Sequence, residues 1–424
     1  MKAFLFKYLR FLVFLPNINP FSALFSSEIF PWGVLFGQSA GFAIPKRYIH
    51  FLAYVTLSGL LVLFLGKSDL MGTSRAASAL VNATLPLGII LVLDDDFLAG
   101  LNKAFHAVFY FHLVLIPVQY LGWFPHFLTP FFGFFIERFT SVSTGDGRGV
   151  AGLFAEPSYL GIAMMYFPIY KIIHDDLKKG DPLWRLWIWV AVVYEVLLIR
   201  SVTGTVFLCI YLLSTQSAKR ILPILGISFI ALLLFLGISK GLDQLPRPLE
   251  IWYQIIYQGE YKNLYGFLLH ESGFRLVSIL GSYSYGFLHL LGSGIGLWGP
   301  ASIVALDNVG IPATELGFFV TWYGGVFDGV RPTAIVADIM LECGLVGTFL
   351  FGRFLLPLIR VKELWSIPEA RSLLIIFLFN ILFLGNIGDP TPFVFLGLTL
   401  RKIMGAEQAR SRFFNPPNIP VDAP

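Results

Sequence analysis

The sequence has few charged residues and almost no cysteine. Only 13% of its 424 residues are Asp, Glu, Lys or Arg, and its two cysteines, Cys209 and Cys343, lie inside apolar runs away from any partner motif. Neither a disulfide framework nor a cysteine-based metal site is therefore indicated. Long polar blocks are also missing, which argues against a separate soluble domain. The chain is 56% hydrophobic with a mean hydropathy of +0.74, the composition of a polytopic membrane protein.

Apolar runs of spanning length recur along the chain. They predict about eleven transmembrane helices, at 28–45, 49–66, 77–94, 105–121, 150–173, 183–200, 202–216, 220–238, 336–358, 372–387 and 389–402. The N-terminal stretch that ends at Pro16 fits both an interfacial segment and an additional span. We therefore expect an all-α integral membrane protein, with one membrane domain over residues 1–424 built as a bundle of about 11–12 transmembrane helices.

The net charge of +4 does not indicate a nucleic-acid partner, because the basic residues fall in short loops between the apolar runs. Five basic clusters alternate correctly with the predicted spans and share one side, which the positive-inside rule makes cytoplasmic: Lys46-Arg47; Lys171 with Lys178, Lys179 and Arg185; Lys219-Arg220; Arg360 with Lys362 and Arg371; Arg401-Lys402 with Arg410 and Arg412. This topology places two segments outside, a loop at about 137–150 and a large periplasmic loop at 240–335. The large loop is expected to contain short amphipathic helices.

Four arginines stand out on the outer side, where the same rule predicts few: Arg148, Arg200, Arg275 and Arg331. Arg75 and Arg247 share that side, but their neighbouring residues are those of an ordinary loop. A guanidinium group keeps its charge and donates bidentate hydrogen bonds to phosphate oxygens. A cluster of such groups at a membrane surface suits a lipid pyrophosphate. The alternative is that each arginine reaches lipid headgroups or pairs with a nearby acid.

Carboxylates near these arginines are candidates for acid–base chemistry. Glu156 lies two helical turns from Arg148 and is the first choice, although it could instead pair with an arginine or cap the helix ahead of Pro157. Asp338 and Glu342 are four residues apart and share a helix face, so they are secondary candidates, with a polar seam between helices as the alternative.

Two further features receive ordinary interpretations. Tyr159 is a secondary candidate for stacking on a sugar ring, although aromatic residues at membrane interfaces are common anchors. The run Asp94-Asp95-Asp96 imitates a metal cluster, but the topology places it in the cytoplasm. We therefore expect neither a metal nor a cofactor.

Three motifs in order resemble bacterial polymerases and ligases of the O-antigen polymerase and ligase superfamily. The first is the stretch from Arg148 to Gly161 with its Glu156-Pro157-Ser158-Tyr159 core. The second is Ser272-Gly273-Phe274-Arg275 followed by the glycine-rich turn at 291–296. The third is Arg331-Pro332-Thr333 leading into the helix with Asp338 and Glu342. The likeness extends from about residue 28 to residue 402.

The resemblance implies a GT-C-like, metal-independent glycosyltransferase of the bacterial inner membrane, with its site facing the periplasm. A polymerase of this family moves a growing glycan from undecaprenyl pyrophosphate to a new lipid-linked repeat unit. Membrane lipids, a flippase and a chain-length regulator are its implied partners. Thr333 stands where the ligases, which transfer glycan to the lipid A core, typically carry a histidine, and this favours the polymerase.

Two other classes of function stay open. A lipid-linked oligosaccharide flippase or other transporter would also need many spans and cationic residues, but its binding residues should line the midplane and show paired repeats. A scaffold within an export complex would tolerate replacement of the outer arginines.

Overall fold

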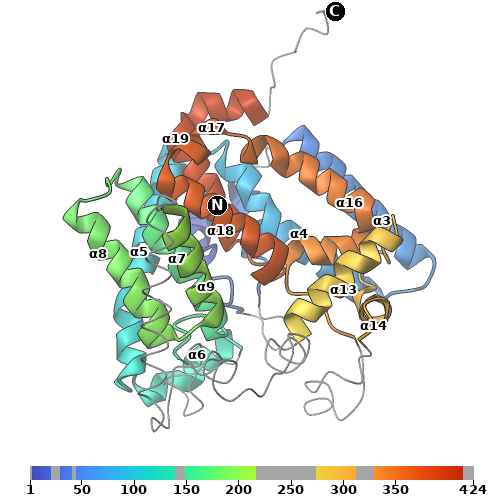
Figure 1. The fold of residues 1–424 in the computed structure, drawn as a ribbon, viewed down its shortest axis with the longest axis horizontal. Helices are drawn as coiled ribbons and strands as arrows, with labels where there is room; N and C mark the ends of the chain where they lie inside the picture. The colour runs from blue at the N-terminus through green and yellow to red at the C-terminus, as the bar shows by residue number, and fades with distance from the viewer. Residues whose placement is uncertain are drawn as a thin grey trace, which may run out of the picture.

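The computed structural model describes residues 2–20, 29–40, 44–137, 139, 149–215, 274–311 and 329–413, and these residues form helices and no strand (Figure 1). The helices are α1 Lys2–Leu12, α2 Trp32–Ala40, α3 Lys46–Phe64, α4 Leu70–Ile90, α5 Asp95–Tyr120, η1 His126–Leu128, α6 Thr129–Phe135, α7 Pro157–His174, α8 Pro182–Val193, η2 Tyr194–Ile199, α9 Val202–Thr215, α13 Phe274–Leu288, α14 Trp298–Asn308, α16 Ile335–Ile359, α17 Lys362–Ser366, α18 Pro368–Phe379, η5 Asn380–Leu384 and α19 Thr391–Phe413.

The all-α class is confirmed for the described residues. Four of their helices are long and apolar enough to cross a membrane: α3, α5, α8 continued by η2, and α16. Two predicted spans need correction. Among its described residues, 29–40 and 44–45, the span at 28–45 contains only the nine-residue helix α2, and the span at 150–173 becomes helical only at Pro157. The predicted span 220–238 lies outside the described residues.

Helix α7 packs against α8, α9, α18 and α19 (Figure 1). Every residue from Leu160 to Ile173 is buried. Aromatic rings fill the space around it: Phe395 of α19 stacks on Tyr166 with ring centroids 5.7 Å apart, and Phe105 and Phe109 of α5 meet Phe167 edge-on. Because α7 runs the length of this core, we use its termini to name the Glu156 end and the Asp175 end of the bundle.

Helices α13 and α14 form a hairpin within the segment predicted as the large outer loop. Tyr285 of α13 packs against Ala301 of α14, and Gly281 lies against the backbone of Ala305, so the two helices run antiparallel. The hairpin starts at the Glu156 end, and its tip, residues 289–297, reaches the middle of α3, where the Tyr54 hydroxyl lies 3.2 Å from the Leu291 carbonyl oxygen. The predicted short helices therefore pack into the bundle. Residues 240–273 and 312–328 of the predicted loop lie outside the described residues.

Helix α16 is broken where this tip meets it. Gly344 has φ 62° and ψ −161°, which ends one helical segment and starts the next. The tip supplies partners for the backbone groups released by the break: the N–H groups of Ser293 and Gly294 donate to the carbonyl oxygens of Leu341 and Glu342, and that of Val346 donates to Leu290. An unpaired backbone group is costly in an apolar surrounding, so the tip makes the break tolerable.

We expect Gly292→Ala to weaken this contact. Gly292 has φ +73°, and an added Cβ would lie 2.5 Å from the backbone of both Glu342 and Gly344. Gly122 also has a left-handed φ, +69°, but no atom of the described residues lies within 4 Å of a Cβ placed there. Gly122→Ala should therefore cost only the left-handed conformation, about 1–2 kcal/mol, and Gly292→Ala clearly more. Denaturant unfolding of the purified variants measures the difference. Equal losses would show that the tip does not pack tightly on α16.

Candidate functional site

An ion pair joins Glu156 to Arg275 at one end of the bundle. The Arg275 Nη2 lies 3.4 Å from the Glu156 Oε2, and the Ser158 hydroxyl donates to the same oxygen at 3.1 Å. Glu156 occupies the N-cap position of α7 in an extended conformation, but its side chain makes no capping hydrogen bond, so the alternative role of helix cap is wrong. The side chains are 22% and 36% exposed for Glu156 and Arg275. Both groups are therefore accessible to a ligand.

A second charged group lies between the start of α16 and the hairpin. Arg331 donates from Nε and Nη2 to the two carboxylate oxygens of Asp338 at 3.0 and 2.9 Å, and its Nη2 lies 3.7 Å from the Glu342 Oε2. Both carboxylates are fully buried, whereas Arg331 is 24% exposed. Burial acts to lower the pKa of Arg331, but the charges of Asp338 and Glu342 outweigh it and raise that pKa. Arg331 is thus held between two buried acids and pairs most closely with Asp338.

The hairpin connects these two charged groups. Arg275 lies in the first turn of α13, and one turn later Ile279 packs against Ala334 and Ala337 at the start of α16. Arg331 precedes Ala334 by three residues. The same face of α13 therefore contacts the segment that follows Arg331 and carries the arginine that pairs with Glu156.

Arg200 and the chain after Arg148 lie near each other. The Val150 N–H donates to the Leu198 carbonyl oxygen at 3.3 Å, and Gly149 packs on the carbonyl of Ile199. Arg200 itself has a left-handed φ of 53°, and its Nη2 donates to the Tyr120 hydroxyl at 3.0 Å. Arg148 lies outside the described residues. Among the described residues, Arg200 contacts Tyr120 and Leu197, not the Glu156–Arg275 pair.

The sequence interpretation missed Glu195, a fully buried carboxyl in the π-helix η2. Neither of its oxygens has a hydrogen-bond partner among the described residues. Gly204 and Gly161 make the space for it, since a Cβ at these positions would lie 1.8 and 3.0 Å from its Oε2. An acid inside the apolar span 183–200 was the available signal, because π-helical turns and buried acids both concentrate at functional positions.

Tyr159 packs, half-buried, against the central apolar core. This contact fits the anchoring interpretation, and sugar stacking stays a prediction.

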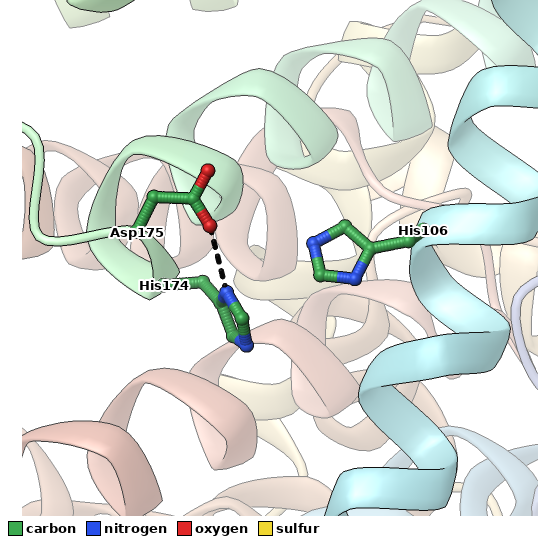
Figure 2. Close-up of side chains that lie close together, drawn as sticks. All are labelled: His106, His174 and Asp175. Atoms are coloured by element: carbon green, nitrogen blue, oxygen red, sulfur yellow. Dashed lines mark hydrogen bonds and ion pairs between the residues drawn. The ribbon is translucent and has the colours of Figure 1, made fainter.

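His106, His174 and Asp175 come together near the other end of α7, with ligand atoms all within 4.8 Å of one another (Figure 2). His174 Nδ1 and Asp175 Oδ1 are 2.9 Å apart. Lys171 lies between Asp175 and His106. Its Nζ is 2.6 Å from the Asp175 Oδ2 and 3.2 Å from the His106 Nε2. Burial alone would raise the pKa of Asp175, but hydrogen bonds from His174 and Lys171 lower it. A metal ion would have to displace the Lys171 ammonium group, so these three residues make a poor metal site.

The acidic run at 94–96 contributes to an ion pair between α5 and α19. Asp95 and Asp96 lie in the first turn of α5, and the Asp95 carboxylate accepts from the Arg401 Nη2 at 2.8 Å.

No protein-family model, no curated protein and no solved structure matches the chain. The chemistry of the candidate site therefore rests on its own residues.

The two arginines should differ in their effect on stability. Arg331→Leu leaves the buried Asp338 carboxylate without its counter-ion, and breaking such a pair typically costs about 3–5 kcal/mol. Arg275→Leu removes an exposed partner from a longer contact and should cost about 0–1 kcal/mol. Denaturant unfolding in one detergent checks both. A small loss for Arg331→Leu would contradict its assignment as a buried counter-ion.

Proposed function

We propose that the protein is a polysaccharide polymerase of the bacterial inner membrane. It transfers a growing glycan from undecaprenyl pyrophosphate to a lipid-linked repeat unit at the periplasmic face. The observation that carries the proposal is the ion pair between Arg275 and Glu156, which come from segments 119 residues apart and stay accessible at one end of a helical bundle. The motif resemblance supplies the reaction class.

The pair offers the two groups that the transfer needs. The acceptor hydroxyl oxygen forms a bond to the anomeric carbon while the bond from that carbon to the pyrophosphate oxygen breaks, and the electron pair leaves with the pyrophosphate. A guanidinium stabilises this growing negative charge. The hydroxyl proton goes to a carboxylate, the role assigned to Glu156. Substrate binding would then separate a pair that holds the two groups in place.

The other arginines divide between two roles. Arg148 and Arg200 are the further cations of the proposed pyrophosphate site. The backbone that follows Arg148 is hydrogen-bonded to the turn just before Arg200, which supports treating these two arginines as one group. Arg331 is already engaged by Asp338 and Glu342, so it contributes mainly by fixing the start of α16 beside α13.

A transporter of lipid-linked oligosaccharide is the second candidate, and the break in α16 favours it. Broken helices with buried charges surround the substrate sites of many transporters. The Glu156–Arg275 pair instead lies at one end of the bundle, which favours the enzyme.

Replacing Arg275 or Arg148 by alanine should abolish long surface glycan and cause single lipid-linked repeats to accumulate in the periplasmic leaflet, because the leaving group loses its counter-charge. Gel analysis of surface glycan and extraction of lipid-linked intermediates measure this. Arg75→Ala is the matched control, an exposed arginine predicted on the same side. A normal ladder in both variants would refute the polymerase, and repeats trapped in the cytoplasmic leaflet would indicate the transporter.

Replacing Glu156 by glutamine tests whether Glu156 accepts a proton in the reaction or only pairs with Arg275. Glutamine can still accept a hydrogen bond from Arg275 but cannot take a proton at neutral pH. We expect at least a 100-fold loss of polymerisation rate, in line with the usual contribution of a general base, with unchanged stability. Retention of most turnover would leave Glu156 as a structural residue only.

A further inference from the structure

The charges of Arg331, Asp338 and Glu342 do not balance. We call these three residues the α16 triad. Two fully buried carboxylates face one guanidinium, so the triad would carry a net negative charge if both acids were ionised. An uncompensated charge in an apolar interior is costly, and buried acids commonly neutralise instead.

Hydrogen bonding distinguishes the two acids. Asp338 receives Arg331 on both oxygens at 3.0 and 2.9 Å, which is the geometry of an ionised, bidentate partner. Glu342 receives the Gly296 N–H on Oε1 at 2.9 Å and a further backbone N–H from Trp298. Its Oε2 is buried, lies 3.7 Å from Arg331, and has no donor among the described residues. Glu342 is therefore the acid with the weaker support for a negative charge.

We infer that the α16 triad binds one proton at neutral pH, carried on the Oε2 of Glu342, which makes the triad electrically neutral. Neutral Glu342 keeps its bond to Gly296 and so holds the hairpin tip on the broken helix. Loss of the proton places a bare charge at this contact. The α13–α14 hairpin is thus docked in a proton-dependent way, and this inference is independent of the proposed enzymatic function.

A sodium ion would also neutralise the triad, but the contact offers it few ligands. The backbone carbonyls nearest the break already accept hydrogen bonds: Leu341 from the Ser293 N–H, Glu342 from the Gly294 N–H, and Cys343 from the Tyr54 hydroxyl at 3.1 Å. Sodium binding needs several free oxygens at once, whereas a proton needs one.

Other titratable groups surround the triad and must be separated from it. Cys343 follows Glu342 in α16, and Tyr54 of α3 contacts the Cys343 carbonyl. Tyr285 of α13 and His289 of the tip lie with ring centroids 4.0 Å apart and ring planes tilted by 48°. Elsewhere, Asp389 is a buried carboxyl that accepts from the Thr391 N–H at 2.9 Å. All of these groups are shared by the wild type and by a variant changed only at position 342, so a difference between the two reports on Glu342.

The test is denaturant unfolding of the full-length protein in detergent between pH 5.5 and pH 7, compared with Glu342→Gln. A carboxyl that keeps its proton when folded and loses it when unfolded makes stability fall as pH rises, because the unfolded state binds fewer protons. The folding equilibrium constant of the wild type should therefore fall about tenfold more per pH unit than that of Glu342→Gln. Glutamine resembles the neutral acid, so the variant should be at least as stable as the wild type at pH 7. Parallel curves, or a variant much weaker at pH 7, would overturn the inference.

Two controls complete the experiment. Asp389→Asn should keep the steeper wild-type fall in the upper half of this range, because Asp389 belongs to a different site. If Glu342→Gln does not fold, Asp338→Asn gives the same comparison, since removing either negative charge removes the need for the extra proton. A wild-type slope of stability against pH in that variant would contradict the inference.

Replacing sodium chloride by choline chloride at constant concentration should leave the stability of the wild type unchanged. Sodium-specific stabilisation of the wild type would instead identify a sodium site.

Discussion

The break in α16 imposes the constraint on which this architecture depends. A helix interrupted inside an apolar bundle releases backbone N–H and C=O groups that water cannot reach. The backbone of the hairpin tip forms hydrogen bonds with these groups, at Leu290, Ser293 and Gly294. Glycine is needed where the two chains approach, because a side chain at Gly292 or Gly344 would meet backbone atoms 2.4–2.5 Å away. The position of the hairpin, and of Arg275 at its start, follows from this contact.

Local spacing was enough to predict part of the charged arrangement. Asp338 and Glu342 are one helical turn apart, so the sequence places them on one face whatever surrounds the helix. Arg331 precedes Asp338 by seven residues, so it could be expected near this carboxylate. The pairing of Arg275 with Glu156 was among the expected alternatives, but the choice of partner depends on tertiary packing across 119 residues and has no local signal.

Other features had no local signal or a misleading one. The run around Gly344 is apolar and continues as a helix by pattern, and only its contact with the tip explains why it breaks there. Span 28–45 is mostly apolar, yet α2 starts only at Trp32, and in its first turn the Asn82 side chain accepts from the Gly33 N–H at 2.7 Å. Glu195 was overlooked because a single acid in an apolar run does not reveal whether it finds a partner.

Burial separates the charged groups into two kinds. The α16 triad is enclosed, so its energetics are those of a low-dielectric interior, where an unbalanced charge dominates. The Glu156–Arg275 pair is partly exposed and longer, so it contributes little to stability and can be exchanged for a ligand. The α13–α14 hairpin contacts both charged groups. Arg275 lies in the first turn of α13 and pairs with Glu156, and the Gly296 N–H of the tip donates to Glu342. A change of charge at the triad would therefore act on the tip first and reach Arg275 through the rigid length of α13.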